Sequence, residues 1–98
     1  MTEFQARVYQ ATKRIPKGRV ASYRTIAKAA GKSAAARAVG NTLHKNTFKS
    51  VPCHRVIRSD GSVGGFARGQ RAKIRILKKE GIVIKNNKTG ERFLLRHL

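Results

Sequence analysis

Residues 22–44 have the sequence SYRTIAKAAGKSAAARAVGNTLH, which carries the clearest fold signal in the chain. Ser22 is a favoured helix N-cap, and Gly31 tolerates the positive φ at which many helices end, so a helix is predicted between them. Ser33 is a second N-cap candidate and predicts another helix over residues 34–44. Two short helices joined by a tight turn with glycine are typical of a helix-turn-helix.

The flanking sequence predicts one further helix on each side. Thr2-Glu3-Phe4-Gln5 has the capping-box pattern, and apolar residues follow at helical spacing, which predicts a helix as far as Arg14. Downstream, residues 70–80 also carry apolar residues at helical spacing, and Gly81 follows them directly. The helix-turn-helix is therefore expected to lie between two other helices.

The C-terminal stretch is predicted to be a β-hairpin. Residues 82–84 and residues 92–95 are largely apolar, and the segment 86–90 between them is rich in turn-forming residues. Helices followed by such a hairpin predict a mainly α fold with a small β-hairpin, of the winged helix-turn-helix type. A chain of 98 residues has room for one core, so we expect residues 1–98 to form a single domain.

The composition predicts a folded chain with a polyanionic partner. Lys and Arg number 23 against 4 acidic residues, which gives a formal net charge of +19. Repulsion on this scale is relieved best by a polyanion, and the candidates are DNA, ribosomal RNA and an anionic membrane surface. Leu, Ile, Val and Phe together number 23 of 98 residues, which is enough for a hydrophobic core.

The sequence carries no sign of a membrane span, an export signal or a metal site. No apolar run approaches the roughly 18 residues of a membrane span, and the segment from Met1 to Gln5 is not a signal peptide. We therefore expect an intracellular protein, in the cytoplasm or nucleoid. Cys53 is the only cysteine, and one thiol with three histidines is a poor zinc site. No metal is expected, and the thiol is either a core residue or a reagent.

Small side chains dominate the predicted helix 34–44 and surround one long cation, Arg37. A helix is about 10–12 Å across and the minor groove about 6 Å wide, so a helix enters that groove only if its exposed face carries small side chains and the groove is opened. Arg37 would then reach into the base stack or into the space left by an extruded base. The alternative is that the small residues allow close helix packing and that Arg37 is a solvated cation. The small residues are Ala34, Ala35, Ala36, Ala38 and Gly40.

Cys53 lies in a predicted turn between Pro52 and His54-Arg55, ahead of a short extended run. A turn presents a thiol at a surface cleft more readily than a helix interior does, and cationic neighbours favour the nucleophilic thiolate. His54 is placed to take the thiol proton through a bridging water, and Glu80 would hold its imidazole in one tautomer. The alternative is a buried structural cysteine with an unrelated glutamate at a helix end.

Several of these motifs, taken in order, resemble one protein family. They are Ala21-Ser22-Tyr23, Ala35-Ala36-Arg37-Ala38-Val39-Gly40, Asn46, Pro52-Cys53-His54-Arg55-Val56-Ile57 and Gly61-x-Val63-Gly64. From Phe4 to Glu80 the chain is similar to the DNA-binding and active-site domain of O6-alkylguanine-DNA alkyltransferases. The resemblance implies a monomer that acts on double-stranded DNA containing alkylated bases. In that family a thiolate takes the alkyl group from guanine O6 or thymine O4 in an in-line displacement and keeps it, without a metal or organic cofactor.

The resemblance also implies a role for each matched residue. Cys53 would be the alkyl acceptor, His54 the water-mediated base, and Glu80 the group that polarises the histidine. Asn46 would tie the active-site loop to the helix-turn-helix. Tyr23 would press on the phosphate beside the lesion and donate a proton to the departing guanine.

The remaining site residues are expected to contact DNA or the flipped base. Arg37 would fill the gap left by the flipped nucleotide. Further DNA contacts are expected from Tyr23, Ala34, Ala35, Ala36, Ala38, Gly40 and Arg55. The substrate pocket is expected to contain Val56, Gly64, Gly65, Phe66 and Ala67.

Some features depart from the family pattern, and two other functions stay open. The N-terminal domain that usually precedes this one is expected to be absent. The segment from Asn46 to Cys53 is one residue shorter and lacks an Asn-Pro dipeptide, and Phe66-Ala67-Arg68 replaces a Tyr-Ser pair. One alternative is an alkyltransferase-like protein that flips lesions without repairing them, a class that resembles this chain with Trp in place of Cys53. The other is a basic architectural winged-helix protein with an incidental thiol.

Overall fold

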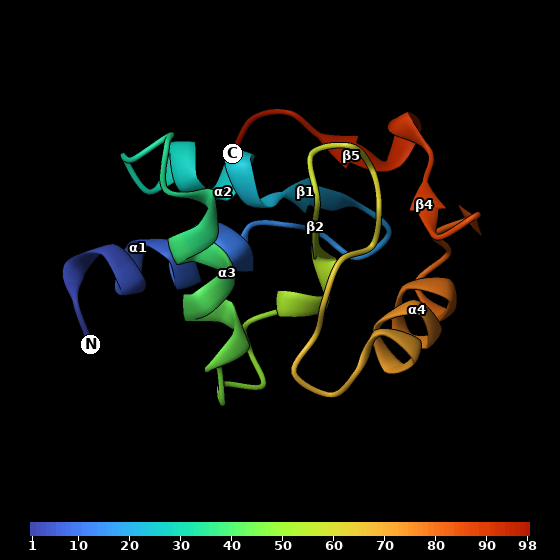
Figure 1. The fold of residues 1–98 in the computed structure, drawn as a ribbon, viewed down its shortest axis with the longest axis horizontal. Coiled ribbons are helices and arrows are strands. Elements are labelled where there is room, and N and C mark those ends of the chain that lie inside the picture. The colour runs from blue at the N-terminus through green and yellow to red at the C-terminus, as the bar shows by residue number, and fades with distance from the viewer.

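The computed structural model describes all 98 residues and is mainly helical with short strands (Figure 1). The helices are α1 (Glu3–Lys13), α2 (Tyr23–Ala29), α3 (Ala36–His44) and α4 (Gln70–Lys79). The strands are β1 (Val20–Ser22), β2 (Val56–Ile57), β3 (Ile84–Lys85), β4 (Lys88–Thr89) and β5 (Leu94–Leu95). Two short 3-10 helices cover Cys53–Arg55 and Glu91–Phe93. The predicted fold class, mainly α with a small β component, is confirmed.

Local capping signals set the first two helices as predicted. The Thr2 hydroxyl accepts from the Gln5 N–H at 3.1 Å, and the Gln5 side chain accepts from the Thr2 N–H at 2.9 Å, which completes the capping box of α1. The Ser22 hydroxyl accepts from the Thr25 N–H at 3.0 Å and starts α2. Gly31 follows the end of α2 with a φ of +87°, a conformation that glycine adopts without steric cost.

The second helix of the helix-turn-helix begins two residues later than predicted. Its N-cap is Ala35, and no side chain caps it, so the prediction of Ser33 as the cap is wrong. The reason lies in the backbone of the connection, where the Ala35 N–H donates to the Lys32 carbonyl at 2.9 Å and closes a turn first. Ala34 and Ala35 therefore precede α3 instead of forming its first turn.

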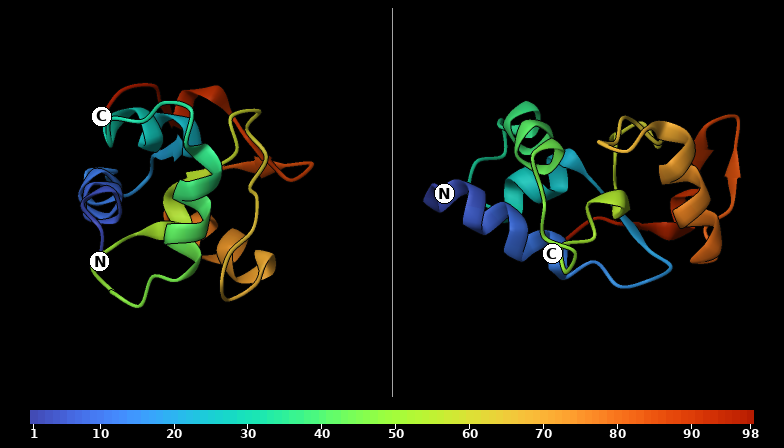
Figure 2. Two further views of the ribbon diagram at one scale, coloured as in Figure 1. Left: turned by 60° about the vertical axis from the view of Figure 1, so that its left-hand side comes forward. Right: turned by 90° about the horizontal axis from the view of Figure 1, so that it is seen from below.

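A three-stranded parallel sheet, in the order β2-β1-β5, separates two groups of core side chains. Successive strand residues point to opposite faces, so Ala21 and Val56 pack with α1, α2 and α3, while Val20 and Ile57 pack with Leu77 of α4. Figure 2 shows the consequence, with α1, α2 and α3 towards one end of the molecule and α4 with β3 and β4 at the other. The residues of the candidate site come from both groups.

The C-terminal stretch pairs differently from the prediction. β3 and β4 form an antiparallel hairpin whose turn, Asn86-Asn87, has φ values of 51° and 63°, a left-handed region that asparagine enters more readily than most residues. The following strand β5 does not belong to the hairpin, because it pairs with β1 and packs its leucines against the core. The prediction that residues 92–95 form the second hairpin strand is therefore wrong.

Candidate active site and nucleic-acid interface

Cys53 stands at the end of the loop that follows α3, and Asn46 holds that loop in place. The Asn46 amide donates to the carbonyls of Phe48 at 3.2 Å and Val51 at 3.3 Å, and its oxygen accepts from the Phe48 N–H at 2.8 Å. The Cys53 N–H in turn donates to the Val51 carbonyl at 2.8 Å. Asn46 thus links the C-terminal end of α3 to the turn that carries the thiol.

A cavity of about 320 Å³ borders the half-buried Cys53. Its walls come from α2, α3 and the loop between β2 and α4. Besides Cys53, the lining residues are Tyr23, Gly40, Asn41, Leu43, His44, Gly65, Phe66 and Ala67. A thiol that borders a cavity of this size is accessible to a ligand, so the interpretation of Cys53 as a sealed core residue does not fit the geometry.

Gly64 and Val56 lie behind this cavity and not in its wall. Gly64 has a φ of +76°, and a Cβ there would lie 3.4 Å from the side chain of Arg58 and 3.6 Å from the ring of Tyr23, so glycine lets the chain pass close behind the tyrosine. The Val56 side chain is fully buried in the core. Because β2 turns this side chain inward, a contact between Val56 and a bound base would have to come from its backbone, and the place of Val56 in the substrate pocket stays a prediction.

Tyr23 forms one wall of the cavity from the first turn of α2, directly after the Ser22 cap. Burial raises the pKa of Tyr23 above its usual value, against the opposing charge of Arg58, and the nearby Cys53 raises it further. The phenol therefore keeps its proton near neutral pH. A protonated hydroxyl in the wall of the cavity can serve as a hydrogen-bond donor or as an acid.

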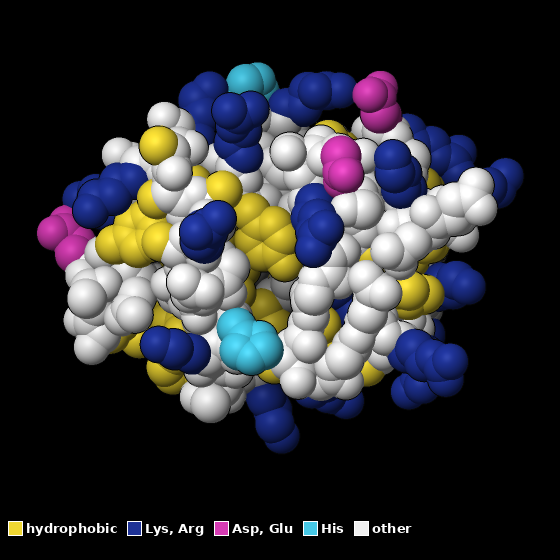
Figure 3. Space-filling model, viewed as in Figure 1, with side chains coloured by type: hydrophobic (Ala, Val, Ile, Leu, Met, Phe, Trp, Pro, Cys, Tyr) yellow, Lys and Arg dark blue, Asp and Glu magenta, His cyan; other side chains and the backbone are white.

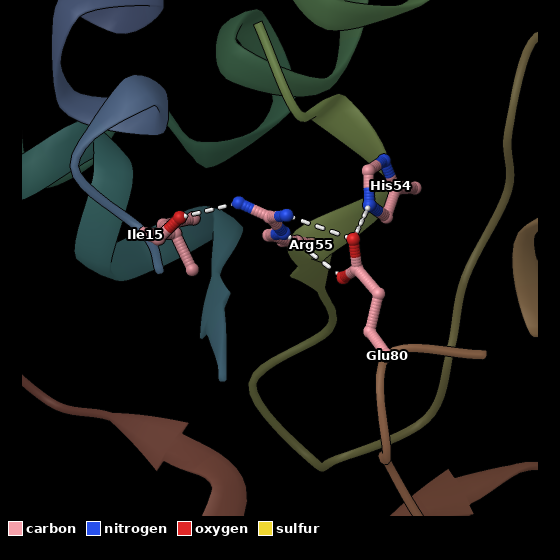
Figure 4. Close-up of polar contacts among 4 residues, drawn as sticks. All are labelled: Ile15, His54, Arg55 and Glu80. Carbon is pink, nitrogen blue, oxygen red and sulfur yellow. Dashed lines mark hydrogen bonds and ion pairs between the residues drawn. The ribbon is translucent and has the colours of Figure 1, made fainter. Parts of the chain in front are cut away.

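His54 and Arg55, the two residues that follow Cys53, meet Glu80 in one polar cluster (Figure 4). Glu80 follows the last turn of α4, and its Oε2 lies 3.1 Å from Nε2 of His54. Arg55 donates to both carboxylate oxygens of Glu80, at 2.9 Å from Nε and 2.7 Å from Nη2, and from Nη1 to the Ile15 carbonyl at 2.8 Å. One carboxylate thus positions both residues that follow Cys53.

The charge state of this cluster prepares His54 to accept a proton. Burial alone would raise the pKa of Glu80, but the hydrogen bonds from Arg55 and His54 outweigh it and hold that pKa below its usual value. Burial lowers the pKa of His54, against the pull of Glu80. A neutral imidazole beside an ionised carboxylate carries its proton on Nε2, which leaves Nδ1 free to accept one.

Arg55 does not face the solvent as a DNA contact. Its side chain is 17 % exposed, and its guanidinium donates to Glu80 and to the carbonyl of Ile15, two residues after the end of α1. The guanidinium uses Nε and Nη2 for the bidentate pair with the Glu80 carboxylate, so these two donors are not available to a phosphate. The prediction that Arg55 contacts DNA is therefore wrong.

Lys73 is a site residue that the sequence analysis missed. It is 0 % exposed, and its ammonium donates to the carbonyls of Val56 at 2.6 Å, Val63 at 2.6 Å and Gly65 at 3.0 Å. Burial lowers its pKa to about 8, while the neighbouring Cys53 raises it. The lysine ties β2 to the loop that forms the cavity wall and places a positive charge beside the thiol.

One signal in the sequence pointed to this burial. Lys73 lies four residues before Leu77, so the two side chains share the apolar face of the helix. A lysine on an apolar helix face is normally read as a boundary residue that extends its amine to water. Only the three carbonyls brought together by the fold show that it stays inside.

A wider groove of about 650 Å³ adjoins the cavity on the side of the helix-turn-helix. It is lined by Tyr23, Arg24, Ala36, Arg37, Gly40, Asn41, Arg58, Ser59, Asp60 and Gly65, and it shares Tyr23, Gly40, Asn41 and Gly65 with the cavity. Arg37 is exposed, and so are the small residues Ala34 and Ala38. Ala34 and Ala38 are therefore not used for close helix packing. The surface of small side chains around Arg37 is open to a ligand.

The positive charge of the chain is largely unpaired. Arg7, Arg55 and Arg96 form ion pairs with carboxylates, and the other Lys and Arg residues form none. Figure 3 shows Lys and Arg side chains spread over the face that carries α3 and gathered at the end near α4. No group of three His, Cys, Asp or Glu side chains gathers where a metal ion could bind. The open groove therefore lies in a strongly positive field.

The free energy of unfolding of the chain is expected to fall in acid, because of His54 and Glu80. The pKa of His54 is lowered by folding, so the unfolded chain binds the proton first and stability is lost as the pH falls below about 6.5. Glu80 has a lowered pKa as well, so a second loss follows as the pH falls below about 4.5. Denaturant unfolding at pH 7.5, 6.5, 5.5, 4.5 and 3.5 measures both. His54→Gln should remove the first loss, and His97→Gln, at an exposed position, should not.

Comparisons with known proteins agree with this arrangement. Residues 3–82 match the family described as 6-O-methylguanine DNA methyltransferase, DNA binding domain. The chain belongs to this family. It is 44 % identical over 82 residues to the methylated-DNA–protein-cysteine methyltransferase of Methanothermobacter thermautotrophicus, a match that covers 83 % of the chain and 46 % of the relative. The chain spans about half the length of the methyltransferases that it matches.

Solved structures from the same family superpose closely. The Mycobacterium tuberculosis OGT in complex with DNA gives a TM-score of 0.79 at 41 % identity, over 83 % of this chain and 50 % of that one. S. pombe Atl1, in complex with damaged DNA containing O6-carboxymethylguanine, gives a TM-score of 0.87 at 32 % identity, over 97 % and 96 % of the two chains. No helix of the structure is both long enough and apolar enough to cross a membrane.

Proposed function

We propose that this chain repairs alkylated DNA by direct reversal, with Cys53 as a single-use alkyl acceptor. The observation that carries the proposal is the position of Cys53, which borders a base-sized cavity while its neighbour His54 is held by Glu80. The cavity opens into the groove beside α3, where the base of a bound duplex would enter. The named activity of the methyltransferase relatives supports the same reaction.

Base extrusion is assigned to α3 and its arginine. An alkylated O6 atom lies in the major groove, so the nucleotide must rotate out before the thiol of a protein bound in the minor groove can reach it. The small residues around Arg37 allow α3 to approach the minor groove, and Arg37 would occupy the space left by the rotated base. The base would then lie between Tyr23 and the loop of Gly65, Phe66 and Ala67.

The transfer itself needs only side chains of this protein. Nδ1 of His54 takes the thiol proton through a water, and the Cys53 sulfur attacks the alkyl carbon as the bond from that carbon to O6 breaks. The electron pair of the broken bond stays on guanine, which Tyr23 protonates. The proton on His54 then returns to Tyr23 through solvent. The product thioether is neutral and is not hydrolysed, so each molecule reacts once.

Intact mass spectrometry tests this proposal directly. The chain is incubated with a tenfold excess of duplex carrying one O6-methylguanine, and the expected result is a gain of one methyl group per protein molecule and no more. The same duplex with ordinary guanine is the control and should give no mass change. An unchanged mass after incubation with the damaged duplex would rule out transfer.

Lesion binding without transfer is the second candidate function. The likeness to S. pombe Atl1, which extends over nearly the whole of both chains, favours it. The retained Cys53 and its cavity favour transfer instead. The same incubation distinguishes them, because a lesion binder retains the damaged duplex preferentially and shows no mass gain.

Arg37→Ala is expected to slow repair of duplex DNA about 10–100-fold and to leave reaction with free O6-methylguanine base within about twofold. The reason is that Arg37 is exposed, outside the cavity, and would act only on extrusion, an unstacking step of a few kcal/mol. Single-turnover rates with the two substrates measure the difference. Equal slowing of both reactions would show that Arg37 does not act on extrusion.

A further inference from the structure

The hairpin β3–β4 is built onto the loop that borders the groove. The Val63 N–H donates to the Asn87 carbonyl at 3.0 Å, and the Thr89 N–H donates to the Gly61 carbonyl at 2.9 Å. A bridge between Ser62 and Lys88 completes the contact. These bonds fix the hairpin beside the turn Arg58–Asp60, which lines the same groove as Arg37. Residues 83–98 lie outside the part of the chain that matches the family.

Two lysines face each other directly across this hairpin. The register opposes Lys85 to Lys88, so both side chains leave the same face, and both are exposed. Ile84, which points to the opposite face, packs against the core. Directly opposed residues have Cβ atoms about 4.5–5.5 Å apart, and like charges at that distance destabilise a hairpin. The hairpin therefore keeps a costly arrangement on its solvent side.

Nothing within the chain neutralises this lysine pair. Neither Lys85 nor Lys88 forms an ion pair with a carboxylate. Asp60 interacts with Lys88 only through its charge. Hydrogen bonds from Ser62 lower the pKa of Asp60 most, and the charge of Lys88 helps, but the Asp60 carboxylate accepts its hydrogen bonds from Ser62 and not from Lys88. The pair is thus free to bind an external anion, and the strand register keeps both lysines on one face, where both ammonium groups can reach the same phosphate.

We infer that Lys85 and Lys88 clamp a phosphate of the DNA backbone and extend the interface beyond α3. This inference rests on the proposed binding of duplex DNA. The cations of the groove, Arg37 and Arg58, lead from α3 towards the hairpin, so one duplex lying along this face would reach both. Figures 1 and 2 show the hairpin projecting at the end of the molecule away from α1.

The test variant is Lys88→Glu, which has opposite expected effects on binding and stability. Undamaged duplex affinity should fall about tenfold at 0.1 M salt, and the slope of log affinity against log salt should fall by about 0.9 for one lost phosphate contact. The new glutamate opposes Lys85, so Tm should rise by about 1–4 °C. Fluorescence anisotropy titrations and thermal melts measure these effects. Methyl uptake from free O6-methylguanine should stay unchanged.

A matched charge change elsewhere separates a local contact from net charge. Lys13→Glu makes the same change at an exposed position in the last turn of α1 and should reduce affinity less than about threefold. Equal losses in both variants, or an unchanged affinity and salt slope in Lys88→Glu, would overturn the inference while the proposed function stands. Failure of the unmodified chain to bind duplex DNA would overturn both.

Discussion

Cys53→Ser is expected to abolish methyl uptake from O6-methylguanine DNA, with the transfer rate reduced by at least about 10³-fold. An alcohol remains protonated in this site near neutral pH, and His54 with one water does not supply the missing nucleophilicity of sulfur. The substitution changes one atom at a half-buried position, so the free energy of unfolding should change by less than about 1 kcal/mol. Loss of transfer would then reflect chemistry and not unfolding.

Duplex binding provides the control for this variant. Cys53 borders the cavity and does not line the groove beside α3, so affinity for damaged and undamaged duplex should remain within about twofold of the unmodified chain. Intact mass, single-turnover kinetics and anisotropy titrations give the three readouts. A methyl group found on Cys53→Ser would show that another side chain accepts it, and the assignment of Cys53 would fall.

Lys73→Met is expected to lower the free energy of unfolding by about 3 kcal/mol and Tm by about 12–24 °C. Methionine fills the same volume but leaves the carbonyls of Val56, Val63 and Gly65 without the donor that now satisfies all three. The gain from no longer burying an ammonium offsets part of this loss, which is why the estimate is below the sum of three charged hydrogen bonds.

An exposed lysine of the same helix is the matched control. Lys79→Met removes the same charge from α4 and should change the free energy of unfolding by less than about 0.5 kcal/mol. Urea unfolding of both variants measures the difference. If Lys73→Met were as stable as Lys79→Met, the three carbonyls would have other partners and the bracing role of Lys73 would be wrong.

Lys73→Met is also expected to slow the reaction of Cys53. The Lys73 ammonium is a buried positive charge that interacts with Cys53, since Cys53 raises the pKa of Lys73, and a positive charge favours the thiolate that attacks carbon. Alkylation by iodoacetamide at pH 7, at a temperature where both proteins are folded, should slow about 5–10-fold, while Lys79→Met should react as the unmodified chain does. This readout does not depend on DNA binding.

Much of the helical structure could be predicted, because its signals are local. The capping box at Thr2, the Ser22 cap and the positive φ of Gly31 each act within a few residues, and the structure confirms all three. The prediction failed where a local signal competed with a partner distant in sequence. Ser33 does not cap α3, because the Ala35 N–H closes a turn with Lys32 first. Residues 94–95 pair with β1 instead of forming the second strand of the hairpin.

The candidate site divides in the same way. The motif around Cys53 is contiguous in sequence, so the proposed acceptor, its neighbour His54 and the helix-turn-helix with Arg37 follow from the residues and their resemblance to a family. One error there, Arg55 as a DNA contact, arose because sequence order does not say which way a side chain points.

The sequence by itself determined the family, the helix-turn-helix, the large positive charge and Cys53 as the proposed acceptor. Only the tertiary structure decided that Glu80, 25 residues from Arg55, binds it and His54 together, and that Lys73 is buried under three carbonyls. It also set Lys85 directly opposite Lys88 beside the groove. Helix caps and turns depend on backbone angles over a few residues, whereas burial, charge pairing and strand register depend on partners that only the folded chain brings within reach.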